Sequence, residues 1–536
     1  MKDGNKAVKT VSLIILATAL SKILGLVRQM VMAYFYGGSD ENAAIGVALN
    51  IPLSFFDIFF GAAILGVFIP IYNSFSSFGK DKNEFGISDK TGKSDKAEEF
   101  ANIFLSFVIL ATGLLVLAGI VFAPRIVDVM AAGFSDETKR MTVDLLRIML
   151  PMIMFTGSVF TLTGVLQSKG EFLAPALVSA FSNLCVIAYF VFLDGYFGVY
   201  GLAVAYLVSW SVQLLTLIIP LYRKKFKYRF KIDFKNPAFL RALKIALPIL
   251  AGSWLLPMSV MIANRFASLF EDYGLVFASF GVSWNLFLIV TGILTYGVCN
   301  YIFPKLAQSA NDANENDEDG QEFVRILKNG MSGLAFIIAP VAVFAFVLRE
   351  EAIAVLFMRG EFTPDIAQAA AQMFMFLAPA MLTFSMIELL NRVFYSKKLV
   401  KFPMIAAASA VAANFILCYI FIEIMGLAPA FITLANLICQ SVALIILTSA
   451  LKLKVRGIFS KKFIANIAKI VLSSGISLII TVIMSSMMGN NAFESGILWN
   501  ILTAVVILTA GAAVYLCANL VLRTNEARIM LKMLKR

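Results

Sequence analysis

The sequence predicts an all-α, polytopic membrane protein with about fourteen transmembrane helices. Of its 536 residues, 60% are hydrophobic and only 15% are charged, and the mean hydropathy is +0.86. A soluble domain of ordinary composition has about a quarter of its residues charged. The apolar stretches are continuous rather than alternating, and many reach the roughly 20 residues that a helix needs to cross a bilayer. Together these observations indicate membrane-spanning helices along the whole chain.

The predicted spans fall into two sets of six and a final pair. They lie at 10–36, 44–73, 101–123, 141–166, 173–193 and 201–222, then at 238–269, 275–304, 326–348, 366–394, 402–423 and 426–451, and last at 465–488 and 496–522. We therefore predict an N-lobe at 1–222, a basic cytoplasmic linker at 223–237, a C-lobe at 238–452, and a C-terminal helix pair with a basic tail at 453–536.

An internal repeat with an offset of 228 residues supports the two six-helix lobes. The residues that recur are Pro151, Ser168, Lys169 and Pro175, which correspond to Pro379, Ser396, Lys397 and Pro403. Two halves with the same even number of spans have the same orientation, so we expect a pseudo-twofold axis along the membrane normal. Proteins built in this way are usually transporters with a site between the lobes. The alternative is that apolar spans resemble each other by composition alone.

Lysine and arginine predict the orientation in the membrane. They gather in alternate connections, such as 223–235 and 452–462, whereas the opposite connections hold few of them, among them Arg125 and Arg359. Positively charged connections stay in the cytoplasm, so we expect both termini to be cytoplasmic in a bacterial cytoplasmic membrane. The net charge of +12 reflects this asymmetry and an attraction to anionic lipids of the inner leaflet, not nucleic-acid binding.

The sequence offers no catalytic or metal-binding constellation. It contains no histidine, and its five cysteines fall within predicted spans without metal-ligand spacing. The stretch GISDKTGKS at 86–94 has five residues between its glycines, whereas a phosphate-binding loop has four. We therefore expect a protein that is not an enzyme and has no cofactor or metal. Its energy would come from a monovalent ion or from the membrane potential, which is worth about 2.3 kcal/mol per charge per 100 mV.

The first span carries the strongest candidate site. Lys22, Gly25 and Arg28 are spaced by three residues, so they share one broad helical face, with the two cations about 9 Å apart along the axis. A charge inside a span is costly, at about 2.5–3.5 kcal/mol, so each one indicates an aqueous cavity or a partner. Two cations on an inward face suit an anionic ligand such as a phosphate. The alternatives are that these side chains snorkel to the surface or pair with an acid such as Asp57 in span two.

Other polar groups inside spans complete the set of candidates. Arg265 in span seven would face the same cavity from the second lobe, or would snorkel to the outer surface. Glu388 and Arg392 are four residues apart and would pair on one helical face. Asn285 is a candidate for the cavity lining, whereas most other amides in spans, including Asn183, are expected to join helices.

Several stretches resemble the MurJ-type lipid II flippases of the multidrug/oligosaccharidyl-lipid/polysaccharide exporter superfamily. Residues 21–28, SKILGLVR, resemble the family's S-R-x-L-G-x-x-R start, and 146–175 resemble its fourth and fifth spans. Residues 264–268, NRFAS, resemble its (D/N)-R-x-x-A-S segment, while LFMRGEFT at 356–363 and RVFY at 392–395 resemble its LFxRGxFT and R-x-F-Y. The similarity runs through about twelve spans, and the two further C-terminal spans also suit this family.

The resemblance implies two lobes that alternate between inward-open and outward-open states around a cationic cavity for a sugar-pyrophosphate head. Lys22 and Arg28 match two functional arginines of the family, the first conservatively changed. The chain also departs from the family pattern. The arginine pair of span two is replaced by Phe56 and Asp57, and the cavity arginine of span eight by Asn285.

The leading functional hypothesis is a flippase that moves an undecaprenyl-pyrophosphate-linked peptidoglycan precursor to the outer leaflet, with Lys22, Arg28, Arg265, Asn285, Gly25 and Asp57 as its site residues. The departures keep open a flippase for another lipid-linked polysaccharide repeat. A cation-coupled drug exporter would need a membrane-embedded carboxylate, for which Asp57 is the best candidate. A scaffold that recruits cell-wall synthesis enzymes through its basic loops is a fourth hypothesis. The sequence leaves the oligomeric state open.

Overall fold

Helices make up every regular element in the part of the chain that the structure describes. The computed structural model describes residues 2–61, 64–76, 93–312, 317–489 and 491–534. Thirteen segments among them are long and apolar enough to cross a membrane. The predicted all-α, polytopic class is therefore confirmed. Most of the glycine-containing stretch at 86–94 lies outside the described residues.

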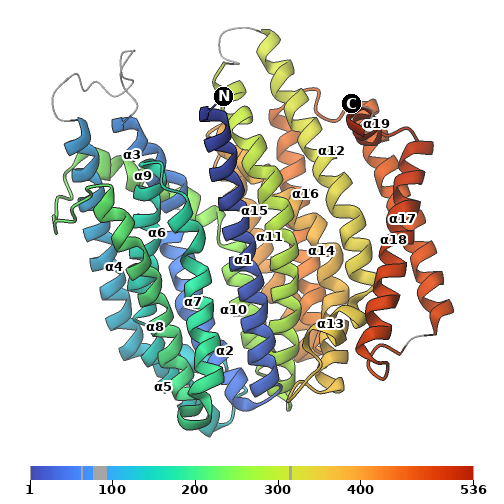
Figure 1. Ribbon diagram of the computed structural model, residues 1–536, viewed down its shortest axis with the longest axis horizontal. Coiled ribbons are helices and arrows are strands. Elements are labelled where there is room, and N and C mark those ends of the chain that lie inside the picture. Colours follow the sequence, from blue (N-terminus) through green and yellow to red (C-terminus); the bar gives the residue numbers. More distant parts are fainter. Residues whose placement is uncertain (1, 62–63, 77–92, 313–316, 490, 535–536) are drawn as a thin grey trace. The chain divides into compact units, whose positions relative to one another are not determined.

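Contacts divide the chain into two compact units (Figure 1). Unit 1 consists of Met1–Phe35 and Asp40–Leu269, and unit 2 of Tyr36–Ser39 and Phe270–Arg536. The elements of unit 1 are α1 (Lys2–Tyr36), α2 (Asp40–Phe56), η1 (Asp57–Gly61), η2 (Ile64–Phe68), α3 (Ile69–Ser76), α4 (Lys93–Met130), α5 (Asp136–Met149), α6 (Met152–Ser168), α7 (Leu173–Phe192), α8 (Asp194–Arg223), α9 (Pro237–Gly252) and α10 (Leu255–Ala267).

The elements of unit 2 are α11 (Tyr273–Asp312), α12 (Asp317–Val347), α13 (Arg349–Phe357), α14 (Pro364–Ser396), α15 (Lys401–Cys418), η3 (Tyr419–Ile424), α16 (Ala430–Lys454), α17 (Lys461–Met488), α18 (Ile497–Val521) and α19 (Asn525–Leu534). Helices α11, α14 and α16 form its packed centre, and α17 pairs with α18 beside α12 (Figure 1).

Hydroxyl groups join the central helices of unit 2. Ser283 Oγ on α11 donates to the Ala370 carbonyl on α14 at 2.8 Å, and the hydroxyls of Thr295 and Ser385 lie 2.6 Å apart on the same two helices. The side chains of Ser283, Thr295 and Ser385 are small, polar and fully buried. Small hydroxyl residues let helix backbones approach closely and bond across the interface in a membrane.

The structure divides predicted span seven into two short helices, α9 and α10, as it divides span four into α5 and α6. The chain leaves α9 at Gly252 and enters α10 at Leu255, with Ser253 and Trp254 between them. Pro257 lies in the first turn of α10, where its missing N–H costs no helical hydrogen bond. A Gly-Ser pair followed by a helix-starting proline is a usual cause of such a break.

Packing groups the helices differently from the predicted lobes. Residues 238–269, predicted in the C-lobe, pack as α9 and α10 against η1, η2, α2 and α4 of unit 1. The predicted basic linker is not free, because the Arg229 amide donates to Asn102 and the Lys231 amide to Ser106, both on α4. The predicted lobes were defined by the sequence offset of the repeat, and contacts do not test that offset. The lobe boundaries therefore stay a prediction.

The two Ser-Lys loops have the same backbone hydrogen bonds. In the first copy, the Lys169 amide bonds to the carbonyl four residues earlier and the Glu171 amide to the carbonyl five residues earlier. The amides of Lys397 and Leu399 make the corresponding bonds in the second copy. Since these positions differ by 228 residues, the loops support the repeat found in the sequence.

The second span is not one continuous α-helix, as the sequence predicted, because it widens into π-helical turns after Phe56. π-Helical turns are rare and often occur at functional sites. Trp254, at the break between α9 and α10, donates its Nε1–H to the carbonyl of Ile58 at 3.1 Å. This bond satisfies a carbonyl of the irregular turn and ties the break in span seven to the distortion in span two.

The loop after α14 contains a residue under backbone strain. Lys398 has φ +56°, whereas the first copy has Gly170, with φ +74°, at the corresponding place. The left-handed conformation costs a residue with a side chain roughly 1–2 kcal/mol. Lys398→Gly is therefore expected to raise the thermal midpoint of the purified protein. The matched control, Lys462→Gly in the first turn of α17, should lower it, and a fall in both variants would refute the strain at Lys398.

The indole bond between the two irregular segments can be tested separately. Trp254→Phe keeps an aromatic ring but removes the donor to Ile58, so we expect a loss of about 1 kcal/mol in the free energy of unfolding. The thermal midpoint would be followed by size-exclusion recovery after heating. The control is Trp499→Phe, whose ring is 46% exposed. Equal midpoints for the two variants would show that the bond contributes nothing.

Candidate functional site

Helix α1 is held against α7 through one of its faces. Ser21 Oγ donates to the carbonyl of Ala176 on α7 at 2.8 Å, and Asn183 Nδ2 donates back to the Ser21 carbonyl at 3.2 Å. A side chain at Gly25 would begin 3.4 Å from Asn183 Nδ2. The prediction that Asn183 joins helices is confirmed. Gly25 thus lies at the contact between α1 and α7, where a Cβ atom would meet Asn183 at about van der Waals distance.

Arg28 lies in an aromatic and mostly apolar setting inside unit 1. Its guanidinium carbon is 5.6 Å from the ring centre of Tyr206 on α8. The Nε atom is buried and has no hydrogen-bond partner among the described residues. The Tyr206 hydroxyl does not serve it, since that hydroxyl lies 3.6 Å from the Met32 sulfur. Arg28 is therefore held by ring packing and keeps a buried N–H donor available.

Lys22 has different surroundings from Arg28, although both lie on α1. Its side chain is exposed on unit 1. Among the described residues, neither cation forms an ion pair with Asp57, which was one of the alternatives for both. Neither Lys22 nor Arg28 therefore has a carboxylate partner among the described residues.

Asp57 begins the first π-helical turn and its side chain is exposed. A Cβ atom at Gly61 would lie 2.8 Å from the Asp57 Oδ1 atom. The carboxylate thus folds over the glycine that follows it by one turn. Gly61 gives this carboxylate room, which the sequence pattern did not predict.

Arg265 is placed at the end of α10, next to a tight turn of unit 1. Its carbonyl accepts a hydrogen bond from Ser268 Oγ at 2.8 Å, and the Gly133 amide donates to the same Ser268 Oγ at 3.3 Å. A Cβ atom at Gly133 would approach the Ser268 carbonyl oxygen to 2.0 Å. The family-like segment NRFAS therefore packs directly on the turn at 133–135.

Asn285 is the one predicted site residue in unit 2. It is half-buried on α11, and its Nδ2 donates to the carbonyl of Gly281 in the same helix at 2.9 Å. The other five predicted site residues belong to unit 1. The assignment of all six to one substrate cavity stays a prediction.

Several partners of the candidate residues lie on distant helices and were not predicted from the sequence. Tyr206 and Trp254 were not singled out, and periodicity within one span cannot reveal them because each acts across helices. Arg392 donates to Asn300 Oδ1 at 2.7 Å and lies 5.7 Å from the Tyr296 ring centre. No ion pair within 4 Å joins it to Glu388 in the described structure, although the two charges interact, so the predicted pairing of these two on one helical face stays a prediction.

Comparisons with known proteins agree on one family. The family model "Lipid II flippase MurJ" matches residues 31–503. A probable lipid II flippase MurJ of Thermotoga maritima is 26% identical over 521 residues, covering 96% of this chain and 97% of the relative. A probable lipid II flippase MurJ of Buchnera aphidicola subsp. Schizaphis graminum is 27% identical over 399 residues, covering 72% of each chain.

Solved structures show the same fold. The lipid II flippase MurJ in an inward closed conformation superposes with a TM-score of 0.73 at 22% identity, covering 94% of this chain and 98% of that one. An inward-facing multidrug resistance MATE family transporter of the MOP superfamily gives a TM-score of 0.65 at 15% identity, covering 82% and 95%. The fold is thus shared across a superfamily, while the family model covers most of the sequence: the chain belongs to the lipid II flippase MurJ family.

Proposed function

We propose that this protein carries lipid II, an undecaprenyl-pyrophosphate-linked peptidoglycan precursor, from the inner to the outer leaflet of the cytoplasmic membrane by alternating access. Membership of the MurJ family supports this substrate. The polytopic helical fold supports a transporter rather than an enzyme. The Lys and Arg distribution supports cytoplasmic termini.

One observation carries the proposed site. Arg28 Nε is buried without a hydrogen-bond partner among the described residues. A buried donor left unpaired costs about 1–3 kcal/mol, and more when the group is charged. A protein keeps such a group where a ligand completes the bonds, and phosphate oxygens accept strong charge-assisted hydrogen bonds from arginine. The pyrophosphate of lipid II is the group that we assign to Arg28.

Lys22 would hold the second phosphate or guide the head toward Arg28. The two residues are six positions apart on one helix, about 9 Å along the axis. Lys22 is exposed, so its ammonium can meet a ligand without any rearrangement of the helices around it. Arg265 would assist from α10, and Asn285 would contribute a neutral amide from α11.

We propose that transport uses the membrane potential or a monovalent ion. The substrate head is anionic, so moving it across the membrane couples to the potential at about 2.3 kcal/mol per charge per 100 mV. Asp57 is exposed beside a distorted, rare helical turn, which makes it the candidate for an ion-coupled step. Cell-wall synthesis enzymes would be the partners that consume the product.

A second candidate is a flippase for another lipid-linked glycan. Phe56 and Asp57 stand where the family has an arginine pair, and Phe56 is buried and stacked on the ring of Phe60. These side chains remove two cations from the predicted cavity and add a carboxylate. A head with fewer phosphate charges would suit this change.

The Arg28 site predicts a specific loss of transport. In cells depleted of their own lipid II flippase, the wild-type chain is expected to restore lipid II in the outer leaflet. The double variant Lys22→Ala/Arg28→Ala should leave it at the depleted level, because two charge-assisted contacts of about 1.5–3 kcal/mol each are lost.

A charge-matched variant separates the site from a general effect of charge. Lys139→Ala/Arg140→Ala removes two cations from α5 of the same unit and should transport normally. Membrane levels of all variants would be compared by immunoblot. Rescue by Lys22→Ala/Arg28→Ala would refute the site, and failure of a well-expressed wild type would favour the second lipid-linked glycan.

A further inference from the structure

The two repeat-equivalent lysines have opposite electrostatic surroundings. In the first copy, Lys169 Nζ lies 2.7 Å from Glu98 Oε1 and also reaches the Lys224 carbonyl at 3.3 Å. In the second copy, Lys397 Nζ lies 4.2 Å from the ring centre of Phe323 on α12. Among the described side chains, Lys397 has no carboxylate partner. The backbone of the loop is the same in both copies, so the difference lies in what faces the lysine.

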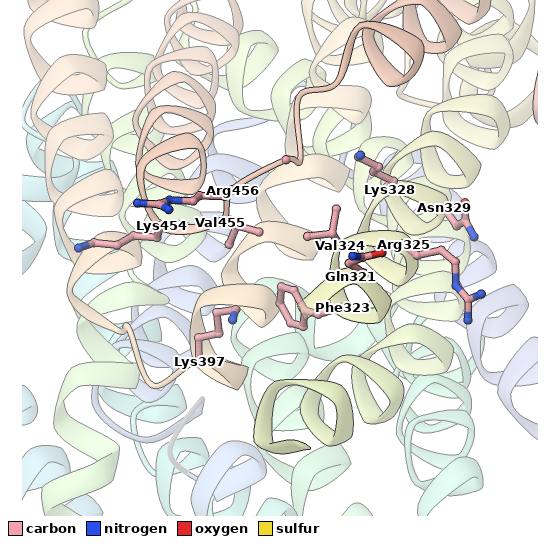
Figure 2. A pocket seen from close by; sticks show the side chains of 11 residues that line it. Gln321, Phe323, Val324, Arg325, Lys328, Asn329, Lys397, Lys454, Val455 and Arg456 are labelled. Carbon is pink, nitrogen blue, oxygen red and sulfur yellow. The ribbon is translucent and has the colours of Figure 1, made fainter. Parts of the chain in front are cut away.

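Lys397 opens into a pocket of about 840 Å³ within unit 2. Its lining comes from the start of α12, the loop after α14 and the connection from α16 to α17, and it includes the cations Arg325, Lys328, Lys397, Lys454 and Arg456. Figure 2 shows Lys397 next to Phe323, with Lys454 and Arg456 on one side of that ring and Lys328 and Arg325 on the other. No acidic residue is among the described residues that line it.

The cations of this pocket are not neutralised within the described structure, with one exception. Arg325 pairs with Glu322 at 2.8 Å, and both side chains are mostly exposed. Lys328 donates to the Ser460 hydroxyl at 3.2 Å, which carries no charge. Lys454 and Arg456 are exposed and have no ion pair with a described residue. Like charges gathered in one pocket repel each other, so the arrangement is stabilised by an anion.

The partial burial of Lys397 also favours the binding of an anion. This side chain is half-buried, and burial lowers the pKa of its ammonium group below the usual value. A buried cation that lacks a counter-ion is disfavoured, and a bound anion would restore the charged form. The same lysine in the first copy already has Glu98 for this purpose.

The pocket lies at the end of unit 2 that carries α19. Helix α17 starts at the pocket and α18 returns to the same end, where α19 follows (Figure 1). The Asn466 side chain on α17 fixes α19, since its Nδ2 donates to Glu526 at 2.9 Å. On α19, Ala527 is buried while Ile529 is 53% exposed. A short helix with an outward apolar side chain and basic residues suits the plane of lipid headgroups.

We infer that this pocket is an anion site for a phosphate group at the cytoplasmic membrane surface. Arg456 supplies a planar donor pair that matches phosphate oxygens, and the lysines supply point charges. The volume accommodates more than a single carboxylate. The phosphate can belong to an anionic phospholipid headgroup or to a soluble diphosphate. The site is separate from Lys22 and Arg28, which lie in unit 1, and does not depend on the proposed transport function.

Binding can be measured on the purified full-length protein. The probes are inorganic pyrophosphate and, in parallel, a short-chain phosphatidylglycerol against the phosphatidylcholine of equal chain length. A ligand that binds only the folded state raises the thermal midpoint, because it stabilises that state by RT ln(1 + [L]/Kd). We expect Lys397→Gln/Arg456→Gln to weaken the apparent affinity at least about tenfold, as the loss of one charge-assisted bond would. Lys452→Gln/Lys462→Gln, which removes two exposed cations outside the pocket lining, should bind as the wild type does.

Each outcome decides the proposal. A response to both anionic probes that only the pocket variant loses establishes a phosphate site open to solvent and lipid. If the pocket variant loses only the response to phosphatidylglycerol, the site binds a lipid headgroup. If it loses only the response to pyrophosphate, the site binds a solute. No response of the wild type to either anionic probe, or equal responses of the pocket variant and the control, overturns the inference. Elution volume and the midpoint without ligand verify that the variants are folded.

Discussion

The absence of water in the bilayer core is the constraint on which this structure depends. Every backbone N–H and C=O group in that region needs a partner inside the protein, and the helix provides nearly all of them. Where the helix is irregular, a side chain has to intervene. The π-helical turn of span two and the break in span seven meet this requirement together, because Trp254 donates to the carbonyl of Ile58. Two local departures from regular structure thus support each other.

Local burial and the nearest side chains decide what each of three cations in the protein can do. Lys169 has a carboxylate and a carbonyl and is satisfied. Arg28 has an aromatic ring on one side and an unpaired Nε. Lys397 faces a ring and a pocket of further cations. A buried positive charge without a carboxylate is costly. Arg28 and Lys397 are therefore the positions where a bound anion would stabilise the protein most.

The two halves of the internal repeat share the backbone of the Ser-Lys loop but differ in the side chains around it. The Ser-Lys loops keep their hydrogen bonds across the 228-residue offset, because those bonds depend on backbone geometry and tolerate many side chains. Glu98 neutralises the lysine of the first copy only. A repeated backbone has therefore acquired a closed ion pair in one half and an open cationic pocket in the other.

The fold class, the order of the spans and the internal repeat followed from the sequence, but the described residues hold thirteen membrane-length helices rather than fourteen, because span seven is broken. Apolar length and charge position follow directly from the cost of placing polar groups in hydrocarbon. The candidate residues Lys22 and Arg28 were found for the same reason, since an ionisable group inside a span is visible in the sequence alone. The sequence placed Gly25 on the same helical face as Lys22 and Arg28, but it did not show which residue Gly25 contacts. Its contact with Asn183 joins positions 158 residues apart.

Only the tertiary structure decided which groups meet. The bond from Trp254 to Ile58, the packing of Arg28 on Tyr206 and the hydrogen bond from Arg392 to Asn300 all join separate helices. Periodicity reports which face of a helix is apolar, but it carries no information on which neighbour that face will contact. The cationic pocket around Lys397 could not be predicted from periodicity either, because its lining comes from three segments far apart in the sequence.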